Sequence, residues 1–226
     1  LEQGDGRFRQ TLAEFLTDAY RARVAAGQLF VTAGASQALD LVCTLFTRPG
    51  DTVLVEDPSY FLALRIFADH GLNVIGIPMD ENGLIVPALE ELLEKCRPAL
   101  IYTIPTFHNP GGCVLSATRR RELIRVSCER NLLVVADEVY HLLNYGADLP
   151  QPLGCNADTA PIISLGSFSK IMAPGLRLGW IQTGKRIMAR LTSCGLLDSG
   201  GGLNPFTSNL VRSAIELGLQ QKQLSL

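Results

Sequence analysis

The sequence SFSKIMAPGLRLGW, residues 167–180, places two basic side chains in a loop of apolar, glycine and proline residues. Strand-like patterns flank this loop at residues 162–165 and 178–182. Single lysines and arginines are ordinarily solvated surface residues, but an unpaired charge is costly in apolar surroundings such as these. The segment therefore indicates that Lys170 is a nucleophile in a dry environment and that Arg177 binds a phosphate or a carboxylate.

Short apolar strands alternate with helices along the rest of the chain. The strands are apolar on both faces, which is typical of a mainly parallel sheet covered by helices on both sides. We therefore predict one α/β domain of three layers, with the sheet between two layers of helices. The remaining strands are predicted at residues 29–32, 52–55, 73–77, 99–104 and 132–136, and the helices at residues 8–23, 37–46, 60–70, 89–96, 117–130 and 204–219.

The composition of the 226 residues narrows the classes of protein to consider. With 47% hydrophobic residues the chain can bury one substantial core, and its net charge of −2 gives no basic surface for nucleic acid or an anionic membrane. No apolar run is long enough to cross a bilayer, so we expect a cytoplasmic protein, or a mitochondrial one if a presequence precedes Leu1. The six cysteines show neither metal-ligand nor disulfide spacing, and we expect free thiols and no metal site.

Polar clusters follow five of the predicted strands. Ligands of parallel sheets bind beyond the carboxyl ends of the strands, so chemistry is expected in these clusters. Taken singly, each cluster has an ordinary explanation as a turn or a helix cap, although a carboxylate at the end of a buried strand, such as Asp137, requires a cationic partner. The clusters are Gly34-Ala35-Ser36, Asp57-Pro58-Ser59-Tyr60, Asn109-Pro110-Gly111-Gly112, Asp137 with Tyr140, and Ser167-Phe168-Ser169-Lys170.

In this order, the clusters resemble those of fold-type I enzymes that use pyridoxal 5′-phosphate (PLP). The resemblance is to the class I/II aminotransferase family, and to its 2-aminoadipate or valine–pyruvate aminotransferase-like branch. Residues 167–180 carry the strongest match, and residues 32–40, 57–60, 108–112 and 137–140 carry the others, so the matches span nearly the whole chain. The resemblance implies a PLP-dependent transferase-like fold, with residues 1–226 as the large, PLP-binding domain.

The resemblance also implies a role for each polar cluster. Lys170 would form the internal aldimine and then carry a proton between the substrate α-carbon and the C4′ atom of PLP, while Asp137 would keep the pyridine nitrogen protonated. Tyr140 completes the implied catalytic set, because with Asn109 it would hydrogen-bond the phenolic oxygen of PLP. The other implied cofactor contacts are Tyr60, stacked on the ring, and Ala35, Ser36, Ser167, Ser169 and Arg177 at the phosphate.

Two features of the family are expected outside this chain. A tyrosine that reaches the neighbouring subunit's cofactor would precede the segment matched by residues 4–9, and the small C-terminal domain, with the arginine that grips the substrate carboxylate, would follow Leu226. We therefore expect a chain truncated before the small domain, which binds PLP better than it transaminates. The implied partners are an amino acid and a 2-oxo acid as substrates, and a second copy of the chain in a homodimer.

Three other functions remain open from the sequence. A PLP-dependent lyase or decarboxylase would share the cofactor residues and would be distinguished by its products. A PLP-binding regulatory module behind a DNA-binding head is the second, although no helix-turn-helix pattern is visible in these residues. A truncated, catalytically weak product is the third. The histidines His70, His108 and His141 lack metal-ligand neighbours, and we expect packing roles for them.

Overall fold

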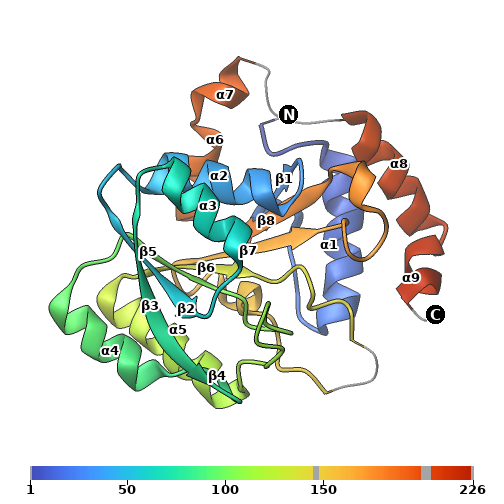
Figure 1. The fold of residues 1–226 in the computed structure, drawn as a ribbon. Coiled ribbons are helices and arrows are strands. Elements are labelled where there is room, and N and C mark those ends of the chain that lie inside the picture. The colour runs from blue at the N-terminus through green and yellow to red at the C-terminus, as the bar shows by residue number, and fades with distance from the viewer. Residues whose placement is uncertain (1, 145–147, 200–204, 225–226) are drawn as a thin grey trace.

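The computed structural model describes residues 2–144, 148–199 and 205–224 of the chain. Within these ranges an eight-stranded sheet has the strand order β1-β8-β7-β6-β5-β2-β3-β4 (Figure 1). Residue 1 and residues 225–226 of the predicted domain lie outside the described residues. The strands are β1 (Leu29–Thr32), β2 (Thr52–Asp57), β3 (Asn73–Asp80), β4 (Gly83–Leu84), β5 (Leu100–Thr103), β6 (Leu133–Asp137), β7 (Ile162–Ser167) and β8 (Gly179–Thr183).

Most neighbouring strands are parallel. The strands β7, β6, β5, β2 and β3 run in one direction, each paired with the next. Strand β8 is antiparallel to both of its neighbours, β1 and β7, and the two-residue β4 is antiparallel to β3. The predicted mainly parallel α/β sheet is therefore confirmed, and the carboxyl ends of β1, β2, β5, β6 and β7 lie at the same edge of it.

Helices cover both faces of the sheet (Figure 1). One hydrophobic cluster joins one face to α2, α3 and α6, and two others join the opposite face to α1 with α8 and to α4 with α5. Because side chains alternate along a strand, Val53 and Val55 of β2 belong to the first cluster and Leu54 to the opposite face. The helices are α1 (Gly6–Tyr20), α2 (Ala35–Phe46), α3 (Phe61–Asp69), α4 (Val86–Lys95), α5 (Ala117–Arg130), α6 (Lys185–Thr192), α7 (Gly195–Asp198), α8 (Pro205–Glu216) and α9 (Leu219–Leu224).

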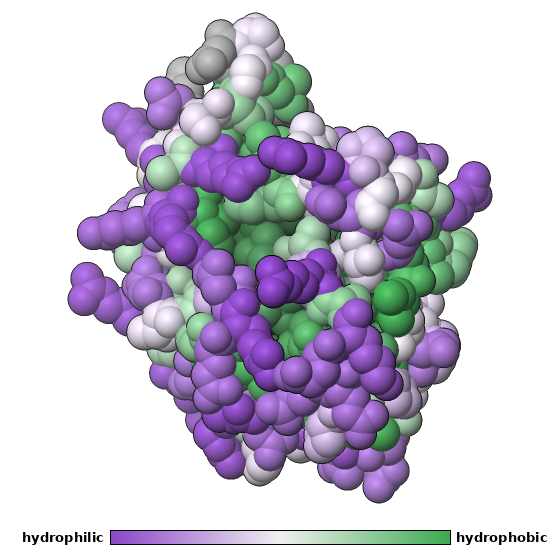
Figure 2. All heavy atoms as spheres, turned by 90° about the vertical axis from the view of Figure 1, so that its left-hand side faces the viewer, coloured by the Kyte–Doolittle hydropathy of each residue, from purple (hydrophilic) through white to green (hydrophobic). Residues whose placement is uncertain are grey.

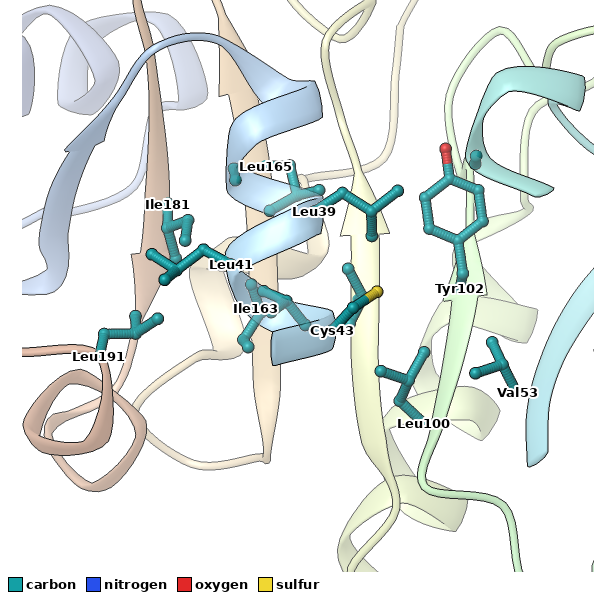
Figure 3. Close-up of a cluster of buried hydrophobic side chains, with 14 of the residues drawn as sticks. Leu39, Leu41, Cys43, Val53, Leu100, Tyr102, Ile163, Leu165, Ile181 and Leu191 are labelled. Atoms are coloured by element: carbon teal, nitrogen blue, oxygen red, sulfur yellow. The ribbon is translucent and has the colours of Figure 1, made fainter. Parts of the chain in front are cut away.

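The cluster on the α2 face is the largest part of the core. Figure 3 shows side chains of α2 and α6 gathered against side chains of the central strands. Tight packing also occurs on the opposite face, where a Cβ atom added to Gly166 of β7 would lie 2.0 Å from the Trp180 ring of β8. A glycine is therefore required for these two strands to pair at this point. The labelled side chains in Figure 3 include Leu39, Leu41, Cys43, Leu100, Tyr102, Ile163, Leu165, Ile181 and Leu191.

Some elements differ from the sequence-based prediction. The helix predicted at residues 204–219 is instead two helices, α8 and α9, because the chain turns at Gly218 with a left-handed φ of 69°. Residue 204 lies outside the described residues. The sequence did not predict α6, whose eight residues bury only Ile187, Met188 and Leu191, nor the short β4 and α7. Strand β3 continues to Asp80, three residues beyond its predicted end.

The surface is mostly hydrophilic when seen from the left-hand side of Figure 1, and hydrophobic side chains gather in a hollow near its centre (Figure 2). None of the helices in the described ranges has both the length and the hydrophobicity that crossing a membrane requires. All six cysteines are unpaired, as the sequence predicted. In the same ranges, no group of three or more His, Cys, Asp or Glu side chains is placed to hold a metal ion.

Candidate functional site

A cavity of about 210 Å³ lies at the carboxyl edge of the sheet, between α2, α3 and the loop that follows β7. The sequence predicted ten cofactor contacts on five separate loops, and all ten residues line this one cavity. They are Ala35, Ser36, Tyr60, Asn109, Asp137, Tyr140, Ser167, Ser169, Lys170 and Arg177.

Two consecutive carboxylates at the end of β6 lie on opposite faces of the sheet, because side chains alternate along a strand. Asp137 lines the cavity on the face covered by α2 and α3. Glu138 lies on the other face, where its carboxylate accepts hydrogen bonds from the backbone N–H groups of Leu153 and Gly154 and from the Ser164 hydroxyl. Alternation therefore brings a single carboxylate from this pair into the cavity.

Asp137 is the buried acid of the cavity, with 8% of its surface exposed. Its Oδ2 accepts a hydrogen bond of 2.7 Å from the Tyr102 hydroxyl, whereas its Oδ1 is buried and accepts none. Burial raises the pKa of Asp137 to about 6, and the hydrogen bond from Tyr102, with a smaller contribution from the Val139 backbone, opposes this rise. A buried carboxylate oxygen without a partner, beside a cavity, is suited to accept a hydrogen bond from a cationic N–H group.

Arg177 and the N-terminus of α2 form an anion-binding arrangement. Gly34, which precedes α2, has a φ of 93°, and a Cβ atom there would lie 2.8 Å from Arg177 Nη2, so the guanidinium rests directly on the glycine backbone. The same Nη2 lies 3.3 Å from the Ala33 carbonyl oxygen, and Nη1 lies 3.4 Å from Ser169 Oγ. No side chain caps α2, which leaves its first N–H groups available beside Ser36. Such a combination suits a phosphate.

Lys170 lines the cavity but is exposed, so the dry environment that the sequence indicated is wrong for this side chain. Its Nζ lies 5.8 Å from the centre of the Tyr140 ring. The reason lies in how the segment folds: Phe168, Ile171 and Leu178 enter the hydrophobic core and leave the two basic residues on the outside of the loop. The apolar neighbours of Lys170 in the sequence are therefore not its neighbours in space.

Tyr60 and Asn109 complete the predicted part of the lining. Burial raises the pKa of Tyr60, and the neighbouring Tyr140 and Asp137 add to the rise. His108, which precedes Asn109, does not line the cavity. Its Nδ1 accepts a hydrogen bond of 3.0 Å from the backbone N–H of Gly111, and its Nε2 lies 3.2 Å from Glu56 Oε2. His108 therefore fixes the turn that carries Asn109.

A second polar network occupies the opposite face of the sheet, around Glu138. The Arg120 side chain is 4% exposed, and its Nη1 lies 3.7 Å from Glu138 Oε1. Its Nη2 donates hydrogen bonds to the Pro105 carbonyl oxygen and to Thr106 Oγ1. Burial lowers the pKa of Arg120, and the charge of Glu138 opposes the fall. The polar groups of this network find their partners within the protein. We therefore interpret the network as a structural support for the site.

The sequence prediction missed several residues of the lining. The most informative is Tyr102 of β5, which lies inside an apolar strand and is fully buried. A buried tyrosine hydroxyl nearly always has a hydrogen-bond partner, and this rule was the only sequence signal that could have drawn attention to it. The others are apolar residues without a chemical signature of their own: Leu39, Leu62, Ala63, Ile66, Ile104, Val139 and Pro174.

Comparison with known proteins identifies the family of the chain. Residues 2–195 match the family described as aminotransferase class I and II. The chain belongs to this family. Membership of the class I and II aminotransferase family agrees with the resemblance carried by residues 167–180, and it implies PLP as the cofactor of the site.

Among the curated relatives of this chain, one is named as a transaminase and another as a transcriptional regulator. The 2-aminoadipate transaminase of Thermus thermophilus is 40% identical over 156 residues, which cover 68% of this chain and 39% of that protein. The uncharacterized HTH-type transcriptional regulator YisV of Bacillus subtilis is 33% identical over 189 residues, which cover 84% of this chain and 39% of that protein. The chain thus spans less than half of the length of these curated relatives.

Solved structures of aminotransferases share the fold. The kynurenine aminotransferase of Pyrococcus horikoshii, in complex with PMP, KYN as substrates and KYA as products, matches with a TM-score of 0.90 and 31% identity. The match covers 99% of this chain and 56% of that chain. The chain therefore has the fold of PLP-dependent aminotransferases.

Proposed function

We propose that this chain is the PLP-binding large domain of an aminotransferase, an enzyme that transfers an amino group between an amino acid and a 2-oxo acid. One observation carries the proposal: the cavity combines the amine of Lys170, the half-satisfied carboxylate of Asp137 and the guanidinium of Arg177 around one space. PLP offers a matching group for each, namely its aldehyde, its ring nitrogen and its phosphate. The similarity to the transaminase of Thermus thermophilus supports the same activity.

The residues present fit PLP on two structural observations. The buried Oδ1 of Asp137 accepts no hydrogen bond, and a protonated ring nitrogen would supply the missing donor. The φ of 93° at Gly34 favours glycine, and without a Cβ atom there the Arg177 guanidinium lies against the uncapped end of α2, where a phosphate would be held. Both features suit a ligand with a cationic ring nitrogen and an anionic phosphate.

We assign the contacts with PLP as follows. Lys170 would hold the aldehyde carbon, Asp137 would pair with the ring nitrogen, and Tyr60 would stack on the ring. The remaining polar residues fall into two groups by the part of PLP that they hold. The phenolic oxygen is bound by Asn109 and Tyr140, and the phosphate by Ala35, Ser36, Ser167, Ser169 and Arg177.

Three side chains would take part in the reaction. When bound, PLP supplies an electron-withdrawing ring that spreads the negative charge formed at the substrate α-carbon. Asp137 holds a proton at the ring nitrogen and so maintains this withdrawal. Once the substrate's amino group has displaced it, the Lys170 amine would carry the proton from the substrate α-carbon to the C4′ position. The Tyr140 hydroxyl stabilises negative charge on the phenolic oxygen by hydrogen bonding.

Borohydride reduction after addition of PLP tests the proposal. The unaltered chain should develop a visible absorption band, and reduction followed by peptide mapping should place the label on Lys170. In Lys170→Ala the band and the label should both be lost, because Lys170 supplies the one amine among the described residues that line the cavity. Lys185→Ala is the matched control, since Lys185 is an exposed lysine at the start of α6 that does not line the cavity. A label that persists in Lys170→Ala would refute the assignment.

The similarity to YisV favours a second candidate, a PLP-binding module of a transcriptional regulator. Turnover separates the two. With 2-oxoglutarate and a panel of amino acids, an aminotransferase should produce glutamate and a new oxo acid, whereas a regulatory module would bind PLP without turnover. Release of ammonia or carbon dioxide would instead indicate a lyase or a decarboxylase.

We further propose a homodimer in a reducing compartment, the cytoplasm or the mitochondrion. Phe206 and Leu210 of α8 are 81% and 55% exposed, and apolar side chains of this size support burial against another subunit. The six unpaired cysteines support a compartment in which thiols stay reduced. Light scattering should give twice the 24.5 kDa mass of one chain. A mass of 24.5 kDa would contradict the homodimer.

A further inference from the structure

We propose that Tyr102 is a positioning residue that acts on PLP through Asp137. Its hydroxyl holds one oxygen of the carboxylate, keeps the carboxylate ionised and leaves the other oxygen to hold the proton of the ring nitrogen. The inference rests on the proposed function, because it names a residue that tunes the same site.

The sheet register places the two side chains on one face. Tyr102 of β5 is directly opposite Val135 of β6, and Asp137 lies two residues further along β6. Residues two apart on a strand face the same side, and a diagonal neighbour is within reach of a long side chain. The observed hydrogen bond from the Tyr102 hydroxyl to Asp137 Oδ2, at 2.7 Å, spans this diagonal.

Packing fixes the direction of the Tyr102 hydroxyl. The residue is fully buried, and the Phe67 ring of α3 meets the Tyr102 ring edge-on, with 5.6 Å between their centres. Figure 3 shows the ring lying along the strands with its hydroxyl directed towards their carboxyl ends. A ring held in this way delivers its hydroxyl to a fixed point beside the cavity, which in turn fixes the plane of the Asp137 carboxylate.

The hydroxyl acts only as a donor. Burial, followed by the charge of Asp137, raises the pKa of Tyr102 well above its ordinary value, so the O–H remains protonated wherever Asp137 titrates. The other charged groups that act on Asp137 are Glu138, which opposes its ionisation, and Lys170, which favours it. Without Tyr102, the buried carboxylate would retain no hydrogen-bond donor from a side chain, and its proton would be harder to remove.

Carbon-13 NMR of labelled aspartate carboxyl groups tests this contact before PLP is added. In Tyr102→Phe the ring is retained and the donor is lost, so the midpoint of the Asp137 titration should move upward by about one pH unit or more. Asp137→Asn identifies the signal by removing it. Tyr20→Phe is the matched control, because it deletes another buried tyrosine hydroxyl that does not line the cavity, and it should leave the midpoint unchanged.

Nitrogen-15 NMR of ring-labelled PLP then tests the action on the cofactor. In the unaltered chain the ring nitrogen should give the signal of a protonated pyridine, and in Tyr102→Phe the signal should shift towards that of the unprotonated ring. A Tyr102→Phe chain with an unmoved Asp137 titration, or with a fully protonated ring nitrogen, would overturn the inference. Failure of the unaltered chain to bind PLP at Lys170 would refute the proposed function instead, whatever the Asp137 titration shows.

The contact can also be tested without a substitution, in case Tyr102→Phe does not fold. In the unaltered chain, exchange of H₂O for D₂O should shift the Asp137 carboxyl carbon signal, because the hydrogen that Tyr102 donates is exchangeable. Absence of this isotope shift at a pH where Asp137 is ionised would contradict the hydrogen bond on which the inference depends.

Discussion

Asp137 and Glu138 are adjacent in the sequence and almost equally buried, yet they have different numbers of hydrogen-bond partners on the two faces of the sheet. Glu138 accepts three hydrogen bonds and lies 3.7 Å from Arg120. Asp137 accepts a hydrogen bond from one side chain, that of Tyr102, and keeps one oxygen without a partner beside a cavity. Burial of a carboxylate therefore does not distinguish a functional acid from a structural one, whereas the number of unfilled acceptor positions does.

Glu56 extends the comparison to β2. Its carboxylate accepts hydrogen bonds from the Thr103 hydroxyl and the Ile104 backbone N–H, and it lies beside His108. Like Glu138, it has partners from the protein and does not line the cavity. Two of the three buried carboxylates at this edge of the sheet thus support the loops around the site, and the third faces into it.

The largest effect on stability is expected from Glu138→Gln. Loss of this charge would leave the buried Arg120 guanidinium without its main compensating charge, and breaking a buried ion pair in this way costs about 3–5 kcal/mol. The free energy of unfolding from urea denaturation measures the loss. The matched control is Glu129→Gln, which removes an exposed glutamate from the C-terminal part of α5. Equal losses in the two variants would show that the buried Glu138 contributes no more to stability than an exposed, ion-paired glutamate does.

Asp137→Asn should have the opposite effect on stability. Relative to the unaltered chain, the free energy of unfolding of this variant should increase as the pH rises. The folded-state pKa of Asp137 is raised from 3.8 to about 6, so the folded chain binds this proton more tightly than the unfolded chain does. This contribution to stability is fully present below about pH 3.8 and is lost as pH rises through about 6, by an amount on the order of 3 kcal/mol. Asparagine carries no such proton, so the variant should lose less stability than the unaltered chain across this range.

Unfolding measured at a series of pH values, without PLP, tests this expectation. The difference in stability between the unaltered chain and Asp137→Asn should change between pH 4 and pH 6 and stay constant above it. A difference that is independent of pH would mean that folding does not raise the pKa of Asp137. The same substitution should abolish the protonation of the PLP ring nitrogen, which separates its effect on stability from its effect on function.

The smallest effect is expected from Asp40→Asn, at an exposed carboxylate. Asp40 of α2 lies 2.8 Å from His70 Nε2, but 62% of its side chain is exposed. Water screens such a pair, so the free energy of unfolding should change by less than about 1 kcal/mol at low salt, and by less still at high salt. A loss as large as that of Glu138→Gln would show that exposure is a poor guide to the value of a carboxylate in this fold.

Much of the fold could be predicted because its strands are apolar on both faces and its helices are periodic. The central strands began and ended within a few residues of prediction, and β6 differed by one residue at each end. Elements that depend on tertiary contacts were missed, such as the eight-residue α6, whose three core residues gain stability only from packing against the sheet. Likewise, Gly218 ends α8 through a backbone conformation that the helical pattern around it did not reveal.

The polar lining of the cavity could be predicted because it follows the strand ends, where parallel sheets bind ligands. Tyr102 escaped prediction because it lies inside a strand and reaches the site only through the length of its side chain. The exposure of Lys170 escaped prediction for the converse reason. Its apolar neighbours in the sequence turn into the core, and the sequence alone does not show on which side of a loop each residue lies.

The contact between Arg177 and the Ala33 carbonyl joins residues 144 positions apart, and this separation has a consequence for folding. The start of α2 is synthesised early, but the place for a phosphate cannot exist until β8 has inserted between β1 and β7. Closing so long a loop is slow compared with forming a helix. A phosphate ligand should therefore recognise only the completed sheet and raise its melting temperature by mass action. Binding of the coloured cofactor would then report, in a refolding experiment, the moment at which the sheet closes.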